Sequence, residues 1–197
     1  MKTLISLICC SLVLSATHLV NAQEVSNASF IYQASQDLSN TDTIPGFESK
    51  TNKLKISGIV YDSDGITPAS NIIISIEQAD ERGDFDVREV NGERYLHNRG
   101  FIKTDADGAY TFYTYIPGND RRFNMLQQLF VKVKEPNDPP YEIASILFDE
   151  DPLLTKLCRK RIAKKGDPSR ILKPTLVDGV FVAQKDIVLP SVVDALN

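Results

Sequence analysis

The residues that carry out most enzymatic chemistry are scarce in this chain. Histidine occurs at two positions, His18 and His97, and His18 lies in an apolar N-terminal segment. The one imidazole outside that segment cannot build a two-histidine metal site. Cys158 is the one cysteine outside the segment, and no catalytic histidine stands near it in the sequence. A cysteine nucleophile is therefore the less favoured interpretation of Cys158. In a mature form without Cys9 and Cys10, an intramolecular disulfide is excluded for it.

Acidic and aromatic residues gather in short stretches. The acidic stretches DFDVREVNGE (84–93) and FDEDP (148–152) have the spacing of solvated loops, and neither has the offsets of a Ca²⁺ loop. No glycine-rich phosphate loop and no nucleophile elbow is present. The aromatic stretch AYTFYTYI (109–116) alternates as a strand does, which favours core packing over a ligand-stacking platform.

The first 22 residues have the pattern of a signal peptide. The basic start MK precedes the apolar run LISLICCSLVL, and VNA precedes Gln23. The run is shorter than the ~20 residues that cross a bilayer, so a retained anchor is the weaker alternative. We expect cleavage, a mature form without a membrane span, and a secreted or periplasmic protein. The formal net charge of −4 disfavours nucleic acid or an anionic membrane as partner.

Beyond residue 52 the pattern is that of strands joined by tight turns. KLKISGIVYD alternates apolar and polar residues, NIIISIEQ is a β-branched run, and DADG (105–108) indicates a hairpin. Pro152 and Gly166 flank the one segment with helical spacing. The sequence thus predicts an all-β sandwich with one short helix. The predicted organisation is a signal peptide (1–22), a polar arm (23–52), the sandwich (53–190) and a C-terminal tail (191–197).

Several segments, in order, resemble the intradiol ring-cleavage dioxygenases, the relatives of catechol and protocatechuate dioxygenases. ISGIVYDSDGITPASNIIISIEQADERGDF (56–85) resembles the family's first hairpin and WQADxxGxY motif. RGFIKTDADGAYTFYTYIPG (99–118) resembles RGxxxTDxxGxYxFxTIxPGxY, and LFVKVKEPN (129–137) stands where the family has HIHxxVxxP. YEIASILFDEDPLLT (141–155) and DGVFVAQKDIVL (178–189) resemble the later loop and last strand. The resemblance implies a prealbumin-like antiparallel β-sandwich over residues 54–189.

Members of that family bind ferric iron with two tyrosines and two histidines, because phenolate oxygens and imidazoles suit that ion. The resemblance places Phe85 and Asp120 at the tyrosine positions and Gln128 and Phe130 at the histidine positions. Met125 stands where the family has an arginine that supports the substrate. All five residues differ from the family's pattern. We therefore expect no iron, and no other cofactor, in this protein.

The sequence leaves three interpretations open. The leading one is an exported, non-catalytic dioxygenase-like protein that acts as a binding or structural module, with a small aromatic ligand or another protein as partner and oligomerisation undecided. The second is an active ferric dioxygenase that cleaves catechol-type rings on a metal site rebuilt from Tyr95, His97 and Asp120. The third is a prealbumin domain like the accessory domains of carboxypeptidases, although the segment after residue 148 favours the dioxygenase group.

Overall fold

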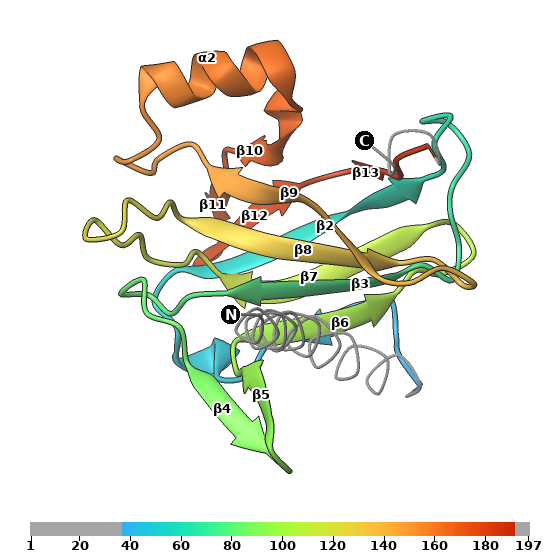
Figure 1. Ribbon diagram of the computed structural model, residues 1–197, viewed down its shortest axis with the longest axis horizontal. Helices are drawn as coiled ribbons and strands as arrows, with labels where there is room; N and C mark the ends of the chain where they lie inside the picture. Colours follow the sequence, from blue (N-terminus) through green and yellow to red (C-terminus); the bar gives the residue numbers. More distant parts are fainter. Residues whose placement is uncertain (1–36, 192–197) are drawn as a thin grey trace, which may run out of the picture.

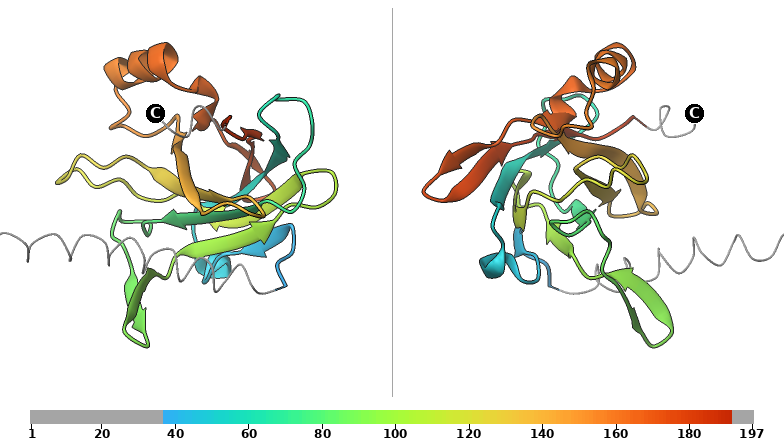
Figure 2. Two further views of the ribbon diagram at one scale, coloured as in Figure 1. Left: turned by 45° about the vertical axis from the view of Figure 1, so that its right-hand side comes forward. Right: turned by 90° about the vertical axis from the view of Figure 1, so that its left-hand side faces the viewer.

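The computed structural model describes residues 37–191. In this part of the chain two β-sheets pack face to face, and one α-helix stands beside them (Figures 1 and 2). Side chains from both sheets form a single buried cluster, with Ile56 and Phe112 from one sheet and Ile76 and Val131 from the other. The predicted all-β sandwich with one short helix is confirmed. The predicted signal peptide lies outside the described residues, as do the start of the arm and most of the tail.

The first sheet has the strand order β1-β7-β2-β12-β11, with β13 paired to β2 beyond the end of β12. Its strands are β1 (Thr41–Thr43), β2 (Lys53–Tyr61), β7 (Ala109–Tyr115), β11 (Thr175–Val177), β12 (Val180–Gln184) and β13 (Ile187–Val188). The second sheet has the order β10-β9-β8-β3-β6. Its strands are β3 (Ile73–Gln78), β6 (Arg99–Lys103), β8 (Gln128–Lys134), β9 (Tyr141–Phe148) and β10 (Ile171–Leu172).

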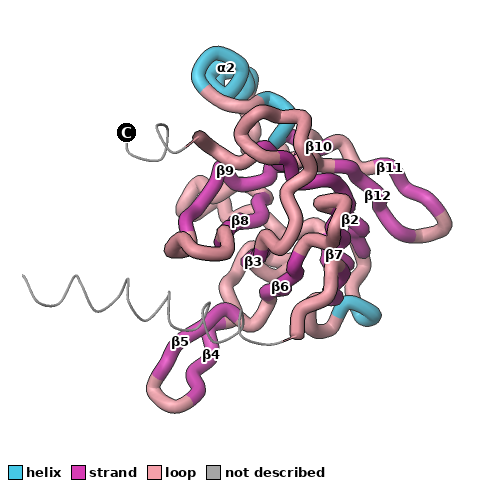
Figure 3. The backbone as a smooth tube through the Cα atoms, turned by 90° about the vertical axis from the view of Figure 1, so that its right-hand side faces the viewer, coloured by secondary structure: helices cyan, strands magenta, loops and turns pink. Residues whose placement is uncertain are grey.

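A separate hairpin of β4 (Val87–Val90) and β5 (Glu93–Leu96) projects from the sandwich. It lies at the opposite end of the molecule from the helix (Figure 3). Asn91 and Gly92 both have positive φ in its two-residue turn, which is the backbone of a type I′ hairpin.

The pairing of the long strands is antiparallel, as expected, but the sheets also contain parallel pairs. Strands β1, β10, β12 and β13 each run parallel to a neighbour. These short strands do not follow their parallel partner through a tight turn, so the antiparallel rule for hairpins does not apply to them. The sequence did not predict β1, which lies in the predicted arm. Ile44 and Phe47 follow it and are buried, so this part of the arm is packed into the sandwich.

Strand β7 shows how the core is built and why its aromatic residues are there. Tyr110, Phe112 and Thr114 are at most 3% exposed, as alternation predicts, and Tyr115 at the strand's end is buried as well. The Thr114 hydroxyl donates to Oε1 of the buried Gln78, and Gln78 Nε2 donates to the Tyr115 carbonyl at 3.1 Å. The described part of the chain therefore uses this aromatic stretch largely as core.

Helix α2 (Lys156–Lys165) lies between Pro152 and Gly166, as predicted. The Thr155 hydroxyl accepts a hydrogen bond from the Cys158 backbone N–H, which caps the first turn. None of its residues is fully buried. A contact between Arg159 and Asp149 ties the helix to the end of β9. Within residues 37–191 no helix is long and apolar enough to cross a membrane.

The buried hydrogen bond between Thr114 and Gln78 predicts a measurable effect of an isosteric substitution. Thr114→Val keeps the shape of the side chain and leaves Gln78 Oε1 without this donor. We expect the free energy of unfolding in urea to fall by about 1–3 kcal/mol. Thr111→Val, on the less buried face of the same strand, is the matched control and should change it by less than about 0.5 kcal/mol. Equal effects of the two substitutions would contradict a stabilising role of the hydrogen bond between Thr114 and Gln78.

Candidate functional site

Two loops from different sheets meet beside the start of β8. One follows β3 and contains residues 79–86, and the other follows β7 and contains residues 116–127. The Gly118 N–H donates to the Asp80 carbonyl at 2.8 Å. A Cβ atom on Gly118 would lie 2.5 Å from Gly83 N, and one on Gly83 would lie 2.5 Å from Asn119 O. Only glycine allows the two backbones to come this close, so these two residues set the geometry of the site.

Phe85 and Phe130 come together where these loops reach β8. Their ring centroids are 6.0 Å apart and their planes are inclined by 49°. Leu129 and Val131 on either side of Phe130 are buried in the sandwich core, so Phe130 faces away from that core. The two rings are therefore in contact, in a tilted arrangement. Both residues are half-buried.

The carboxylate of Asp120 is held by Arg122. Arg122 donates from Nε to Oδ1 at 3.0 Å and from Nη2 to Oδ2 at 2.8 Å, and its backbone N–H donates to Oδ1 at 2.8 Å. Arg122 Nη2 also donates to Asp84 Oδ1 at 3.0 Å. Asp84 directly precedes Phe85, so Arg122 connects the two loops by ion pairs. The hydrogen bond from Arg122 lowers the pKa of Asp120, and the same contact raises the pKa of Arg122.

Met125 and Gln128 occupy the remaining two positions of the predicted site. Met125 exchanges two backbone hydrogen bonds with Asp120, of 2.8 and 2.9 Å, and is half-buried. Gln128 begins β8, pairs with Leu147 of β9, and shares a strand face with Phe130. The structure therefore brings Phe85 to Phe130 and places Asp120 beside the residue that precedes Phe85. Gln128 lies two residues from Phe130 on the same face.

The alternative metal ligands are positioned differently. Tyr95 lies on the projecting β5 strand, where the Arg99 guanidinium stacks on its ring at 4.4 Å. His97 follows that strand, and its backbone N–H donates to the Asp86 carbonyl at 2.8 Å. No contact found among residues 37–191 joins Tyr95 or His97 to Asp120. Nor does this part of the chain contain a group of three or more His, Cys, Asp or Glu side chains arranged to hold a metal ion.

The residues that the resemblance places at iron positions do not fit ferric iron. The rings of Phe85 and Phe130 have no lone pair to donate, and the Gln128 amide is a neutral, weak ligand. Asp120 offers one carboxylate, but an ion could use it only by displacing the two-point contact with Arg122. A hard ferric ion requires several anionic or imidazole donors, and this set supplies one.

Sequence reasoning did not identify Arg122, although it connects both loops. The pattern Asp120-Arg121-Arg122 was the only indication, because an arginine two residues after an aspartate can fold back onto its carboxylate. The partner Asp84 is 38 residues away in the chain, and only the meeting of the loops reveals that contact.

The ion pair predicts a pH-dependent contribution to stability. The folded-state pKa of Asp120 lies below the ordinary value of 3.8, so its contribution is complete above that pH and is lost as the pH falls below it. Asp120→Asn should therefore lower the urea midpoint of unfolding at pH 7. The difference between the midpoints of the variant and the unmodified protein should become smaller towards pH 3. Asp107→Asn, in an exposed turn, is the control and should behave as the unmodified protein does. A difference in urea midpoint that stays constant with pH would contradict the ion pair between Asp120 and Arg122.

The chain was compared with known proteins by sequence and by structure. No family model matches the chain, and no curated protein matches it significantly in sequence. Solved structures do match. The dioxygenase domain of a dioxygenase–carbohydrate-binding protein fusion from Streptomyces sp. SirexAA-E is 21% identical with a TM-score of 0.57, over 79% of this chain and 91% of that one. An intradiol ring-cleavage dioxygenase from Tetranychus urticae is 14% identical with a TM-score of 0.57, over 80% and 89%.

The 3-chlorocatechol 1,2-dioxygenase from Rhodococcus opacus 1CP gives a similar result. It is 18% identical with a TM-score of 0.56, over 77% of this chain and 64% of that one. Identities this low establish the fold and not the activity. The chain has the fold of the intradiol ring-cleavage dioxygenases.

Proposed function

We propose that this protein is an exported, non-catalytic, dioxygenase-like protein that acts as a binding or structural module. The observation that carries the proposal is the contact of Phe85 with Phe130, at two of the four positions where the resemblance places iron ligands. Asp120, at a third position, is engaged by Arg122. Ferric ring cleavage requires the metal, and this donor set does not support its binding.

The residues at these positions have a structural use of their own. In the family, as the resemblance implies, one metal would join the loop after β3, the loop after β7 and strand β8. Here the Phe85–Phe130 contact joins the first loop to β8, and Arg122 joins the two loops through Asp84 and Asp120. A pair of aromatic rings contributes about 0.5–1.5 kcal/mol beyond its area burial. The substitutions thus preserve the arrangement of the segments without a metal.

The other interpretations have less support. A rebuilt metal centre requires Tyr95, His97 and Asp120 to converge, and their described contacts lie with different neighbours. A carboxypeptidase-accessory type of domain would share the sandwich. The similarity to dioxygenases extends over 91% of the Streptomyces domain, however, which favours that group.

Export is supported by the sequence alone. The basic start, the apolar run and the small residues before Gln23 form the pattern of a cleaved signal peptide. A secreted or periplasmic protein is part of the proposal on that basis. A small aromatic ligand or another protein is the proposed class of partner.

Restoring the ligands tests whether these positions are the remains of an iron site. The variant Phe85→Tyr, Asp120→Tyr, Gln128→His and Phe130→His supplies two phenols and two imidazoles from the same segments. After addition of one equivalent of ferric iron, we expect a visible phenolate-to-iron charge-transfer band and about one bound iron per chain. The unmodified protein treated in parallel should remain colourless.

A control variant introduces the same residue types at two other positions. Phe123→Tyr and Gln127→His add one phenol and one imidazole at other positions of the loop of residues 116–127 and should produce no band. A stoichiometric coloured ferric centre in the unmodified protein would contradict the non-catalytic proposal. In that case Tyr95→Phe and His97→Gln would identify the ligands. A folded fourfold variant that binds no iron would show that the four positions do not converge as the resemblance implies.

A further inference from the structure

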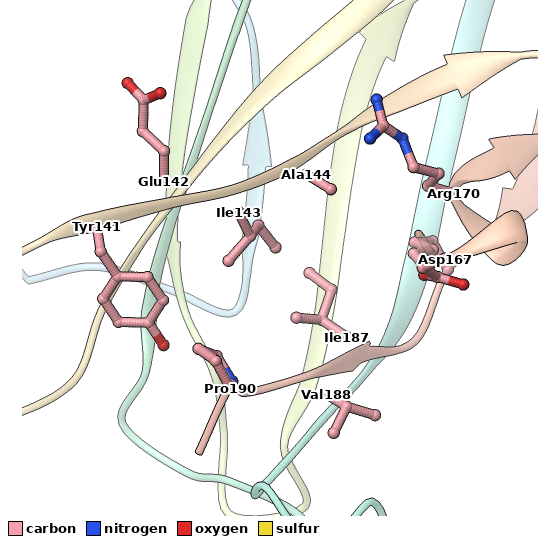
Figure 4. A pocket seen from close by; sticks show the side chains of 10 residues that line it. Tyr141, Glu142, Ile143, Ala144, Asp167, Arg170, Ile187, Val188 and Pro190 are labelled. Carbon is pink, nitrogen blue, oxygen red and sulfur yellow. The ribbon is translucent and has the colours of Figure 1, made fainter. Parts of the chain in front are cut away.

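A cavity of about 480 Å³ lies between the start of β9 and the C-terminal segment of the sandwich (Figure 4). None of Phe85, Asp120, Gln128 and Phe130 lines it. The register of β8 and β9 explains the separation, because Ile143 pairs with Val131 whereas Gln128 pairs with Leu147. The cavity is therefore at the other end of this strand pair from the degenerate iron positions.

The cavity exists because the two sheets are not closed against each other here. Strand β10 pairs only with Leu147 and Phe148, so on that side it leaves the first half of β9 uncovered. Strand β13 pairs with the end of β2 in the other sheet. Ile143 from β9 and Ile187 from β13 lie on facing walls of the gap, with Val188 and Pro190 beside Ile187 (Figure 4). These side chains give the cavity apolar walls.

One end of the cavity carries charge. Lys185 is only 9% exposed, and its ammonium group donates to Asp167 Oδ2 at 2.8 Å and to Ser169 Oγ at 2.5 Å. Lys185 and Asp167 thus neutralise each other. The Tyr141 hydroxyl donates to Glu135 at 2.8 Å, and Glu142 carries its carboxylate away from Ile143 (Figure 4).

Arg170 is the second cation that lines the cavity, and unlike Lys185 it has no acidic hydrogen-bond partner among residues 37–191. Its Nε atom is buried and has no hydrogen-bond acceptor, and no ion pair of its guanidinium is found among residues 37–191. Burial lowers the pKa of Arg170, and the charge of Asp167 offsets this only in part. An arginine remains protonated in proteins, so a half-buried cation with one buried, unsatisfied N–H is left at the cavity wall. A buried donor of this kind lowers the stability of the folded protein unless an acceptor binds it.

We propose that this cavity binds a small organic anion, with its carboxylate on Arg170 and its apolar body against Ile143, Ile187 and Val188. Arginine is suited to a carboxylate because its planar fork can donate two parallel hydrogen bonds. Helix α2 directly precedes the Arg170 segment and carries six basic and no acidic residues, which attracts anions to this end of the molecule. An aliphatic acid and an aromatic acid share the required chemistry.

Isothermal titration calorimetry of the mature protein distinguishes an aliphatic acid from an aromatic acid as the ligand. The probes are octanoate, 3-phenylpropanoate and the uncharged 1-octanol. We expect at least one of the two acids to bind on the order of tenfold more tightly than 1-octanol, because the carboxylate satisfies Arg170. Preference for octanoate identifies an aliphatic ligand, and preference for 3-phenylpropanoate identifies an aromatic one.

Two pairs of variants separate charge recognition from folding. Arg170→Gln should weaken binding of the acid on the order of tenfold, whereas Arg161→Gln, an equal loss of charge on exposed α2, should not. Val188→Asp adds a carboxylate at the half-exposed rim and should weaken binding of the acid more than binding of 1-octanol, because both ligands lose an apolar contact but only the acid meets a like charge. Val177→Asp, on a similarly exposed residue of β11, is its control. Both acids binding no more tightly than 1-octanol, or equal effects of Arg170→Gln and Arg161→Gln, would overturn the proposal.

Discussion

The close approach of two backbones, at Gly83 and Gly118, is the constraint on which the candidate site depends. Neither position has room for a Cβ atom, and Gly83 has a φ of 90° that other residues rarely adopt. This contact joins a loop of one sheet to a loop of the other. It places Asp84 and Phe85 next to Asp120 and against the start of β8. The identities of the side chains then decide what the site does.

In this chain those side chains form packing and ion-pair contacts instead of a metal coordination sphere. Phe85 rests against Phe130, and Arg122 is bound between Asp84 and Asp120. Each contact joins segments that the resemblance assigns to a single metal ion in the family. The ion pairs are solvent-accessible on the arginine side, so the ring contact is the less salt-sensitive of the two. Under the proposed function, these contacts keep the geometry of the site without its iron chemistry.

The sequence predicted the parts of this structure that depend on local patterns. Alternation identified β2 and β7, a β-branched run identified β3, and Pro152 with Gly166 bounded the helix. The pairings of β1 and β13 were not predictable, because each depends on a partner strand far away in the chain. The same holds for Arg122 with Asp84 and for the cavity at Arg170. Both arise from segments that only the folded chain brings together, and neither matches a motif of the family.

The central claim is that the protein does not carry out ferric ring cleavage, and ring cleavage can be measured directly. The purified mature protein, incubated with one equivalent of ferric iron and then desalted, would be assayed for bound iron and for oxygen uptake with catechol and 3-chlorocatechol. We expect iron far below one per chain and no oxygen uptake above that of free iron. One tightly bound iron per chain, together with catalytic oxygen consumption and a ring-opened diacid product, would contradict this account.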